Sequence, residues 1–232
     1  MKDLKYLVAY SIPAVAILGL IFRGYGAFFT PIFAFILVPV LEVLLSEQPK
    51  NLNEFEVLSK AKSKFFNLLL YLNIPVVFGI LGWFIWSNTW ANYSTAELVG
   101  FIFSMGIVAG SNGINVAHEL GHRKLAWERM LGKLLLLPSL YMHFYIEHNF
   151  GHHQNAATNE DPASAAYNQS VYSFWFTSIS RQYLSGWKIQ LDLLKRGGLS
   201  FFSIKNDMIW YVLIQLGYLT LITVFFGIET TG

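Results

Sequence analysis

The sequence has no cysteine and few charged side chains. Charged residues make up 13% of the 232 residues, against about 25% in a typical soluble domain. The lack of cysteine excludes a disulfide-stapled secreted domain, and a net charge of +2 excludes a nucleic-acid-binding protein with a strongly basic face. In contrast, 54% of the residues are hydrophobic and 17% are aromatic. This composition excludes a disordered chain and favours a membrane protein.

Five apolar stretches predict membrane-spanning helices, because a helix needs about 20 apolar residues to cross the hydrocarbon core. Four of them carry at most one charged residue, and the stretch 98–117 is weaker because Ser111, Asn112 and Asn115 lie in its last third. We therefore predict an all-α fold, a polytopic membrane helical bundle with spans near 6–22, 27–45, 65–86, 98–117 and 208–228. A single membrane-embedded domain over 1–232 is expected, with a catalytic segment at 118–207.

The distribution of Lys and Arg predicts the orientation in the membrane. With the N-terminus in the cytoplasm, 15 of the 16 basic residues fall on the cytoplasmic side and only Arg23 falls outside. The apolar stretch 134–146 is about 20 Å long as a helix and contains Pro138. It is predicted to be re-entrant or covered by protein, since a crossing there would place the basic segment 181–205 outside.

All six histidines lie between positions 118 and 153, and the first two predict a metal site. His118 and His122 follow directly from the fourth span, and residues four apart share one face of a helix. Ser111 and Asn115 extend this face. Polar groups that face lipid are costly, so the stripe predicts a wet or metal-lined cavity at the end of the span.

The second cluster of histidines predicts that the site is dinuclear. His148 and His152 repeat the spacing of four, and His153 is turned about 100° from His152 on a helix. Gly151 is expected to let the backbone approach the site closely. Imidazole suits iron, zinc, copper and nickel alike, so the spacing leaves the metal open. Nearby acids are expected to orient the ligating imidazoles: Glu119, Glu147, Glu160 and Asp161.

His143 lies five residues before His148, at the end of an apolar stretch. For this residue we favour a packed or hydrogen-bonded side chain over a ligand.

Two chemistries fit the histidines. Residues 118–122 alone match H-E-x-x-H, the zinc-protease signature in which the glutamate is the general base. That interpretation needs a third ligand and gives His148, His152 and His153 no role. A histidine-rich di-iron centre in a membrane oxygenase uses both clusters, with an apolar substrate that reaches the site from the bilayer.

Three segments resemble the integral-membrane alkane 1-monooxygenases of the fatty-acid desaturase-like superfamily: residues 118–122, 147–153 and 158–164. The similarity continues through 168–172 and 206–210. Three residues separate His148 from the pair His152 and His153, whereas desaturases usually have two. This spacing is similar to that of the alkane and xylene monooxygenase branch.

The resemblance implies a non-haem di-iron enzyme of a bacterial inner membrane, with its histidine boxes on the cytoplasmic face. Such enzymes bind two iron ions and hydroxylate the terminal carbon of n-alkanes to 1-alkanols. They use dioxygen and electrons from rubredoxin, which rubredoxin reductase supplies. A xylene-type methyl hydroxylase and a fatty-acid desaturase stay open as alternatives.

The resemblance also implies roles for particular residues. The ligands by position are His118, His122, His148, His152 and His153. Their expected polar partners are Glu119, Glu147, Asn115 and Asp161. No role is implied for His143. Because opposite charges steer association, we expect basic residues to dock an acidic rubredoxin, with Lys124, Arg129 and Lys195 as candidates.

The family has further histidines downstream, in a Glu-His-Tyr-Gly-type segment and a His-x-x-His-His box, and neither occurs in this sequence. The site that the resemblance implies therefore needs more imidazoles than the six present. From this we expect an N-terminal fragment of a longer enzyme, and we expect the polypeptide expressed alone to hydroxylate no octane.

Overall fold

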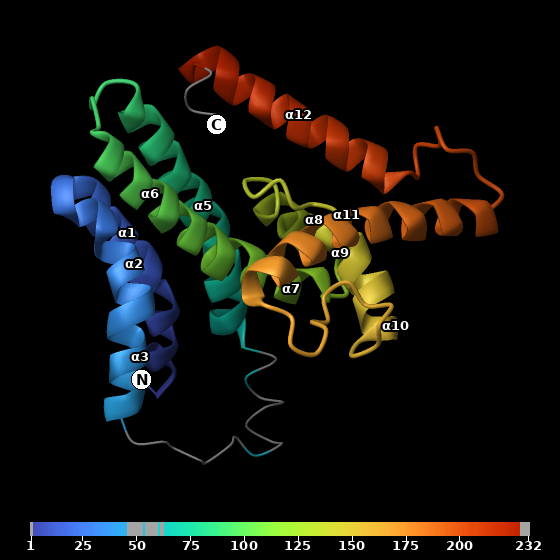
Figure 1. The fold of residues 1–232 in the computed structure, drawn as a ribbon, viewed down its shortest axis with the longest axis horizontal. Helices are drawn as coiled ribbons and strands as arrows, with labels where there is room; N and C mark the ends of the chain where they lie inside the picture. The colour runs from blue at the N-terminus through green and yellow to red at the C-terminus, as the bar shows by residue number, and fades with distance from the viewer. Residues whose placement is uncertain (1, 46–52, 54–59, 61–62, 228–232) are drawn as a thin grey trace. The chain divides into compact units, whose positions relative to one another are not determined.

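The structure is a computed structural model that describes residues 2–45, 53, 60 and 63–227. Every regular element within these residues is helical (Figure 1), which confirms the predicted all-α fold. Five helical stretches are long and apolar enough to cross a membrane: Asp3–Phe22, Gly24–Leu44, Lys64–Asn88, Thr95–Gly121 and Asp207–Phe226. They agree with the predicted spans to within a few residues, and they support a multi-pass membrane protein. Ile228, the predicted end of the last span, lies outside the described residues.

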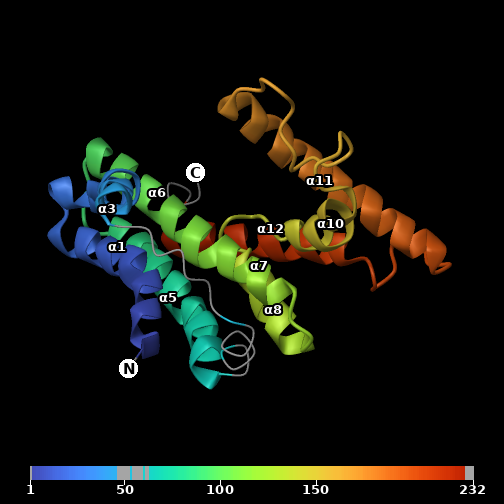
Figure 2. The same cartoon turned by 90° about the horizontal axis from the view of Figure 1, so that it is seen from below.

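The chain divides into two compact units, Met1–Leu120 and Gly121–Gly232. In the first unit, α1, α5 and α6 lie side by side in both views (Figures 1 and 2). The elements of this unit are η1 (Lys2–Tyr10), α1 (Ser11–Phe22), η2 (Gly24–Phe28), α2 (Phe29–Ile32), η3 (Phe33–Leu37), α3 (Val38–Leu44), α5 (Lys64–Asn88), α6 (Thr95–Val108), η4 (Ala109–Ile114) and α7 (Asn115–Gly121).

Small residues let α6 approach η2 closely. A Cβ atom on Gly100 would lie 2.9 Å from the Cβ of Ala27, so only glycine fits at this crossing. Next to it, the Ser104 hydroxyl donates a hydrogen bond of 2.9 Å to the Ala27 carbonyl. Such close packing is how helices associate in lipid, where the hydrophobic effect does not drive them together.

The start of α6 is joined to the connection between the first two spans. Ser94 and Glu97 form a capping box, and Glu97 also accepts a hydrogen bond of 2.8 Å from the backbone N–H of Gly24. The connections 23–26 and 87–97 therefore lie at the same end of the first unit. If the first four spans cross the membrane in alternating directions, as predicted, these two connections must lie on the same side.

Buried amide side chains join η1, α5 and η4. Asn112 donates a hydrogen bond of 2.8 Å to Asn73 Oδ1 and one of 3.2 Å to the Ala9 carbonyl. Asn73 in turn donates to the Leu69 carbonyl at 2.7 Å. Asn112, which weakens the apolar stretch 98–117, is thus satisfied by neighbouring helices. Its side chain holds the bundle together and does not line the predicted cavity.

The second unit contains α8 (Ala126–Leu135), α9 (Phe144–Glu147), η5 (His148–His152), α10 (His153–Asn155), α11 (Val171–Arg196) and α12 (Asp207–Phe226). Here α11 packs along α9. The stretch 134–146 does not form one helix: α8 ends at Leu135 and the chain then turns, with a positive φ of 51° at Leu140. Leu136, Met142 and Ile146 are buried, so protein covers this stretch, as one of the two predicted arrangements requires.

Candidate metal centre

The first two histidines lie at the end of a long helical run whose register changes just before them. In η4 the backbone is π-helical, and the N–H of Asn115 bonds to the carbonyl of Gly110, five residues earlier. A π-helical turn inside an α-helix is rare and often marks a functional site. His118 then lies on α7 and His122 directly follows it.

The second cluster also contains a π-helical turn. In η5 the backbone N–H of His153 bonds to the carbonyl of His148, so this hydrogen bond spans five residues instead of the four of an α-helix. As a result His148 and His153 lie on the same face, with ring centroids 4.5 Å apart. The sequence analysis, based on α-helical spacing, paired His148 with His152 instead. Those two rings stack at 5.3 Å, but the side chain of His152 has a different partner.

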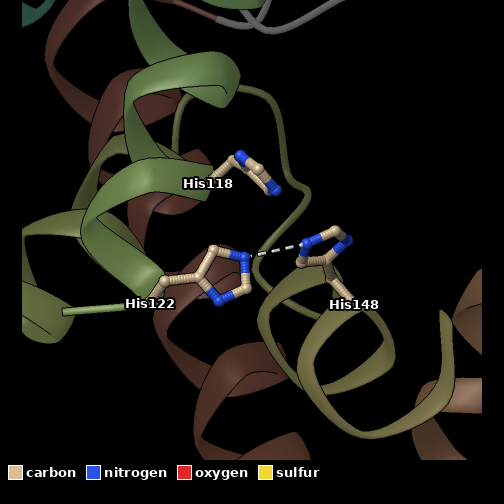
Figure 3. Close-up of side chains that lie close together, drawn as sticks. All are labelled: His118, His122 and His148. Atoms are coloured by element: carbon tan, nitrogen blue, oxygen red, sulfur yellow. Dashed lines mark hydrogen bonds between the residues drawn. The ribbon is translucent and has the colours of Figure 1, made fainter. Parts of the chain in front are cut away.

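Three imidazoles converge on one point in the second unit. The Nε2 atom of His122 lies 3.1 Å from Nε2 of His148 and 3.3 Å from Nε2 of His153. His118 lies one helical turn before His122. Together with His122 and His148 it forms a group whose ligand atoms all lie within 4.8 Å of one another. Figure 3 shows its ring extending from the same helix as that of His122 toward His148.

This arrangement fits a metal better than a set of hydrogen bonds. An imidazole nitrogen carries either one N–H or one lone pair in the ring plane, so Nε2 of His122 can satisfy only one of its two nitrogen neighbours by hydrogen bonding. By contrast, imidazoles bound to one ion at about 2.0–2.1 Å hold their nitrogens roughly 2.9–3.4 Å apart. The observed separations of 3.1 and 3.3 Å fall in that range.

His152 is held by a carboxylate. Its Nδ1 lies 2.9 Å from Oδ2 of Asp161, which is buried. The same carboxylate accepts hydrogen bonds from the Ser164 hydroxyl at 2.6 Å and from the Ala163 backbone N–H at 2.9 Å. Burial acts to raise the pKa of Asp161, but the hydrogen bonds from Ser164, Ala163 and His152 outweigh it and leave the pKa below its ordinary value. A hydrogen bond at Nδ1 directs the other ring nitrogen, Nε2, toward a metal.

Glu147, the residue directly before His148, carries a buried carboxyl group, and 1% of its surface is exposed. Burial, and next the nearby charge of Asp161, raise its pKa to about 7. A Cβ on Gly151 would lie 2.8 Å from Oε1 of Glu147 and 2.8 Å from Cδ1 of Ile189. A Cβ at 151 would therefore displace the ends of the Glu147 and Ile189 side chains, and glycine lets both of them pack against the backbone of η5.

His143 lies outside the cluster. It is buried, and its ring packs edge-on against Tyr141 at 4.6 Å and Tyr183 at 5.1 Å. Neither ring nitrogen has a hydrogen-bond partner among the described residues. Burial lowers the pKa of His143 to about 4, so the ring is neutral near pH 7. The structure thus places it as a packed side chain.

The remaining polar residues predicted beside the histidines lie on η4 and α7. The side chains of Glu119 and Asn115 are exposed, and the Ser111 hydroxyl bonds to the Ile107 carbonyl of its own helix at 2.7 Å. Sequence reasoning missed Ser164 as a partner of Asp161. The turn residues at 161–164, Asp-Pro-Ala-Ser, were the available signal, since aspartate and serine commonly bond to backbone and side chains within a turn.

Comparison with known proteins decides the family. The sequence model of the fatty acid desaturase family matches residues 88–231, which include all six histidines. The chain belongs to the fatty acid desaturase family. This membership agrees with the predicted superfamily. It also argues against the zinc-protease alternative, because the motif at 118–122 is one part of a longer family pattern.

Several curated proteins in this family resemble the chain over most of its length. An alkane 1-monooxygenase of Pseudomonas putida is 32% identical over 97% of this chain. Alkane 1-monooxygenase 1 of Pseudomonas aeruginosa is 34% identical over 84%. The xylene/toluene monooxygenase hydroxylase component of Pseudomonas putida is 29% identical over 93%. The chain spans 57%, 52% and 57% of the length of these relatives. The predicted resemblance to alkane monooxygenases is confirmed.

Proposed function

We propose that this chain forms part of the active site of a membrane di-iron hydroxylase that converts n-alkanes to 1-alkanols. The observation that carries the proposal is the convergence of His122, His148 and His153, with nitrogens 3.1 and 3.3 Å apart, in a chain whose curated relatives include alkane 1-monooxygenases. The proposed ligands are the five histidines of the two boxes: His118, His122, His148, His152 and His153.

The protein residues position the metals. Two bound iron ions would supply the activation of dioxygen for insertion of one oxygen atom into a C–H bond. Asp161 holds the ring of His152, and Glu147 supports the backbone at Gly151 from behind. Glu119 and Asn115 remain proposed polar partners on α7. Since the five spans are apolar, an alkane dissolved in the bilayer would meet apolar protein surface there.

We infer that rubredoxin delivers the electrons, that rubredoxin reductase reduces it, and that the histidine boxes face the cytoplasm of a bacterial inner membrane. The surface supports docking of an acidic protein at two of the three candidate positions. Lys124 and Lys195 are exposed, whereas Arg129 is only partly exposed and donates hydrogen bonds to the carbonyls of Arg123 and Lys124. Electrostatic docking of this kind predicts turnover that falls with rising ionic strength.

The experiment uses cells that express the natural reading frame encoding these residues, together with rubredoxin and its reductase. Membranes are given octane, a methyl-substituted toluene and a fatty acyl substrate, and the products are identified by gas chromatography and mass spectrometry. We expect 1-octanol, dependent on rubredoxin, with little product from the other two substrates. Hydroxylation of the aryl methyl group alone would support the second candidate, which the xylene/toluene monooxygenase relative favours. A double bond in the acyl chain as the sole product would overturn both.

A further inference from the structure

The second unit contains a cationic cavity that the proposed chemistry does not use. It has a volume of about 410 Å³ and lies among α8, α9, α11 and the start of α12. Arg129, Lys133 and Lys205 line it together with a single acid, Asp207. The rest of its wall is largely apolar, with Ile146 and Leu199 among the lining residues. Three bases against one acid give the cavity a net positive charge of two.

Two of the three basic side chains of this cavity, those of Lys133 and Arg129, are held in place by neighbouring groups. Lys133 Nζ lies 3.1 Å from Asp207 Oδ2 and 4.5 Å from the centre of the Tyr145 ring. Arg129 Nη1 donates to two backbone carbonyls, at 3.0 and 2.6 Å. A guanidinium has five N–H groups, so these bonds fix Arg129 and leave it donors for a ligand.

Lys205 stands on an anchored stretch of backbone. Its carbonyl accepts a hydrogen bond of 3.1 Å from Gln190 of α11, and its backbone N–H bonds to the hydroxyl of Ser203 at 3.3 Å. The next residue, Asn206, is fully buried and caps α12 through its side chain. The backbone that carries Lys205 is thus anchored at the wall of the cavity, while the Lys205 side chain itself is exposed.

The cavity lies where a membrane span begins. Asp207 is the first residue of α12, one of the five candidate spans. In the connection just before it, Phe202 is 85% exposed and Ile204 is 81% exposed. Trp210 donates from its indole N–H to the Ile204 carbonyl at 2.9 Å. Exposed apolar side chains, a tryptophan and a lysine within a few residues are typical of a segment at the membrane–water interface.

We propose that this cavity binds the phosphate group of an anionic phospholipid from the bilayer that α12 spans. The net positive charge matches the phosphate, the apolar wall matches the glycerol and upper acyl chain, and the start of α12 sets the depth of the headgroup. Basic pockets beside membrane helices commonly bind such headgroups. The proposal is independent of the metal centre and of the substrate.

Native mass spectrometry of the detergent-purified chain tests this binding, with phosphatidylglycerol and phosphatidylcholine added in equal amounts. We expect preferential retention of phosphatidylglycerol, unaffected by excess inorganic phosphate. Each basic residue near a membrane surface contributes about 1 kcal/mol toward an anionic lipid, or about fivefold in affinity. Lys205→Gln should therefore weaken retention about fivefold and the double variant with Arg129→Gln about 25-fold. Lys205→Arg should restore it.

The matched control is Lys195→Gln, which removes an exposed lysine near the end of α11 that does not line the cavity. It should leave lipid retention unchanged, and circular dichroism should show equal helix content in all variants. Equal retention of the two lipids would overturn the proposal. So would equal losses in Lys205→Gln and Lys195→Gln, or displacement by inorganic phosphate. If an acidic protein bound through Arg129 and Lys205 while lipid retention showed no charge preference, the cavity would be a protein-docking site instead.

Discussion

Each unit of the chain contains a cluster of polar side chains, and the two clusters are built from different kinds of partner. In the first unit, an amide N–H meets an amide oxygen, as between Asn112 and Asn73 at 2.8 Å. In the second unit, imidazole nitrogen meets imidazole nitrogen, at 3.1 Å from His122 to His148 and 3.3 Å to His153. The amide cluster is complete as a structural link between helices. The imidazole cluster brings ring nitrogens together at separations that fit a shared metal ion.

Replacing His122 should have the largest effect on iron binding, because its Nε2 faces both His148 and His153. In the protein made from its natural reading frame, His122→Ala should abolish iron binding and hydroxylation. Iron per protein is measured by mass spectrometry of the elements after purification. Gln154→Ala, an exposed neighbour of His153, is the matched control and should keep full iron. Iron content in His122→Ala equal to that of the unchanged protein would refute the ligand assignment.

Replacing the carboxylate that holds His152 should lower metal affinity by a smaller amount. Asp161→Asn removes the negative charge from the 2.9 Å contact with Nδ1, and losing such a partner commonly lowers metal affinity about 10–100-fold. Competition with a chelator measures this affinity. Glu160→Gln changes an exposed acid one residue away and should have little effect. If both variants bound metal equally well, Asp161 would not position the ring.

His143 is the histidine whose replacement should leave metal binding intact and change acid stability. Its pKa is about 4 in the folded chain and about 6.5 when unfolded, so the folded state loses stability as pH falls below the unfolded value. The expected loss between pH 7 and pH 5 is about 2 kcal/mol.

Unfolding by sodium dodecyl sulfate in mixed micelles at the two pH values measures this difference. His143→Phe keeps an aromatic ring between Tyr141 and Tyr183 and removes the titration, so its stability should change less over this pH range. Loss of iron in His143→Phe with an unchanged fold would show that His143 belongs to the metal centre.

Breaking the amide cluster should cause the smallest change, a small loss of stability toward unfolding. Asn112→Leu removes the bond to Asn73, and interhelical hydrogen bonds in membranes average about 0.6 kcal/mol. The same unfolding measurement should therefore show a loss of that order, with unchanged metal content. Ser111→Ala removes hydrogen bonds within one helical run, to the Ile107 carbonyl and to Asn112 Oδ1, leaves the bond between Asn112 and Asn73 in place, and should cost less. Loss of metal in Asn112→Leu without loss of stability would contradict the comparison between the clusters.

Sequence patterns predicted the spans well because apolar length is a direct physical requirement of the bilayer. The helical stretch Thr95–Gly121 extends the weakest predicted span, 98–117, through the polar positions that obscured it. The sequence alone did not show that Asn112 would find Asn73, which is 39 residues away. Polar residues in a span indicate a partner, but only the packing of helices identifies it.

The structure brings together histidines that the sequence analysis proposed as ligands, but in a geometry that was only partly predicted. The spacing of His118 and His122 on a helix led directly to their proximity. The spacing of His148, His152 and His153 did not, because η5 is π-helical and its backbone hydrogen bond spans five residues instead of four. The side chain of His153 therefore meets His122, while His152 turns to Asp161. No residue type marks a π-helical turn in advance, so α-helical spacing was the reasonable assumption.

The central claim is that these histidines hold iron. The most direct test is the metal content of the protein purified from cells that express its natural reading frame in medium containing both iron and zinc. The account predicts about two iron ions per chain, with an X-ray absorption spectrum of iron dominated by imidazole nitrogen ligands. One zinc ion per chain and no iron would contradict it.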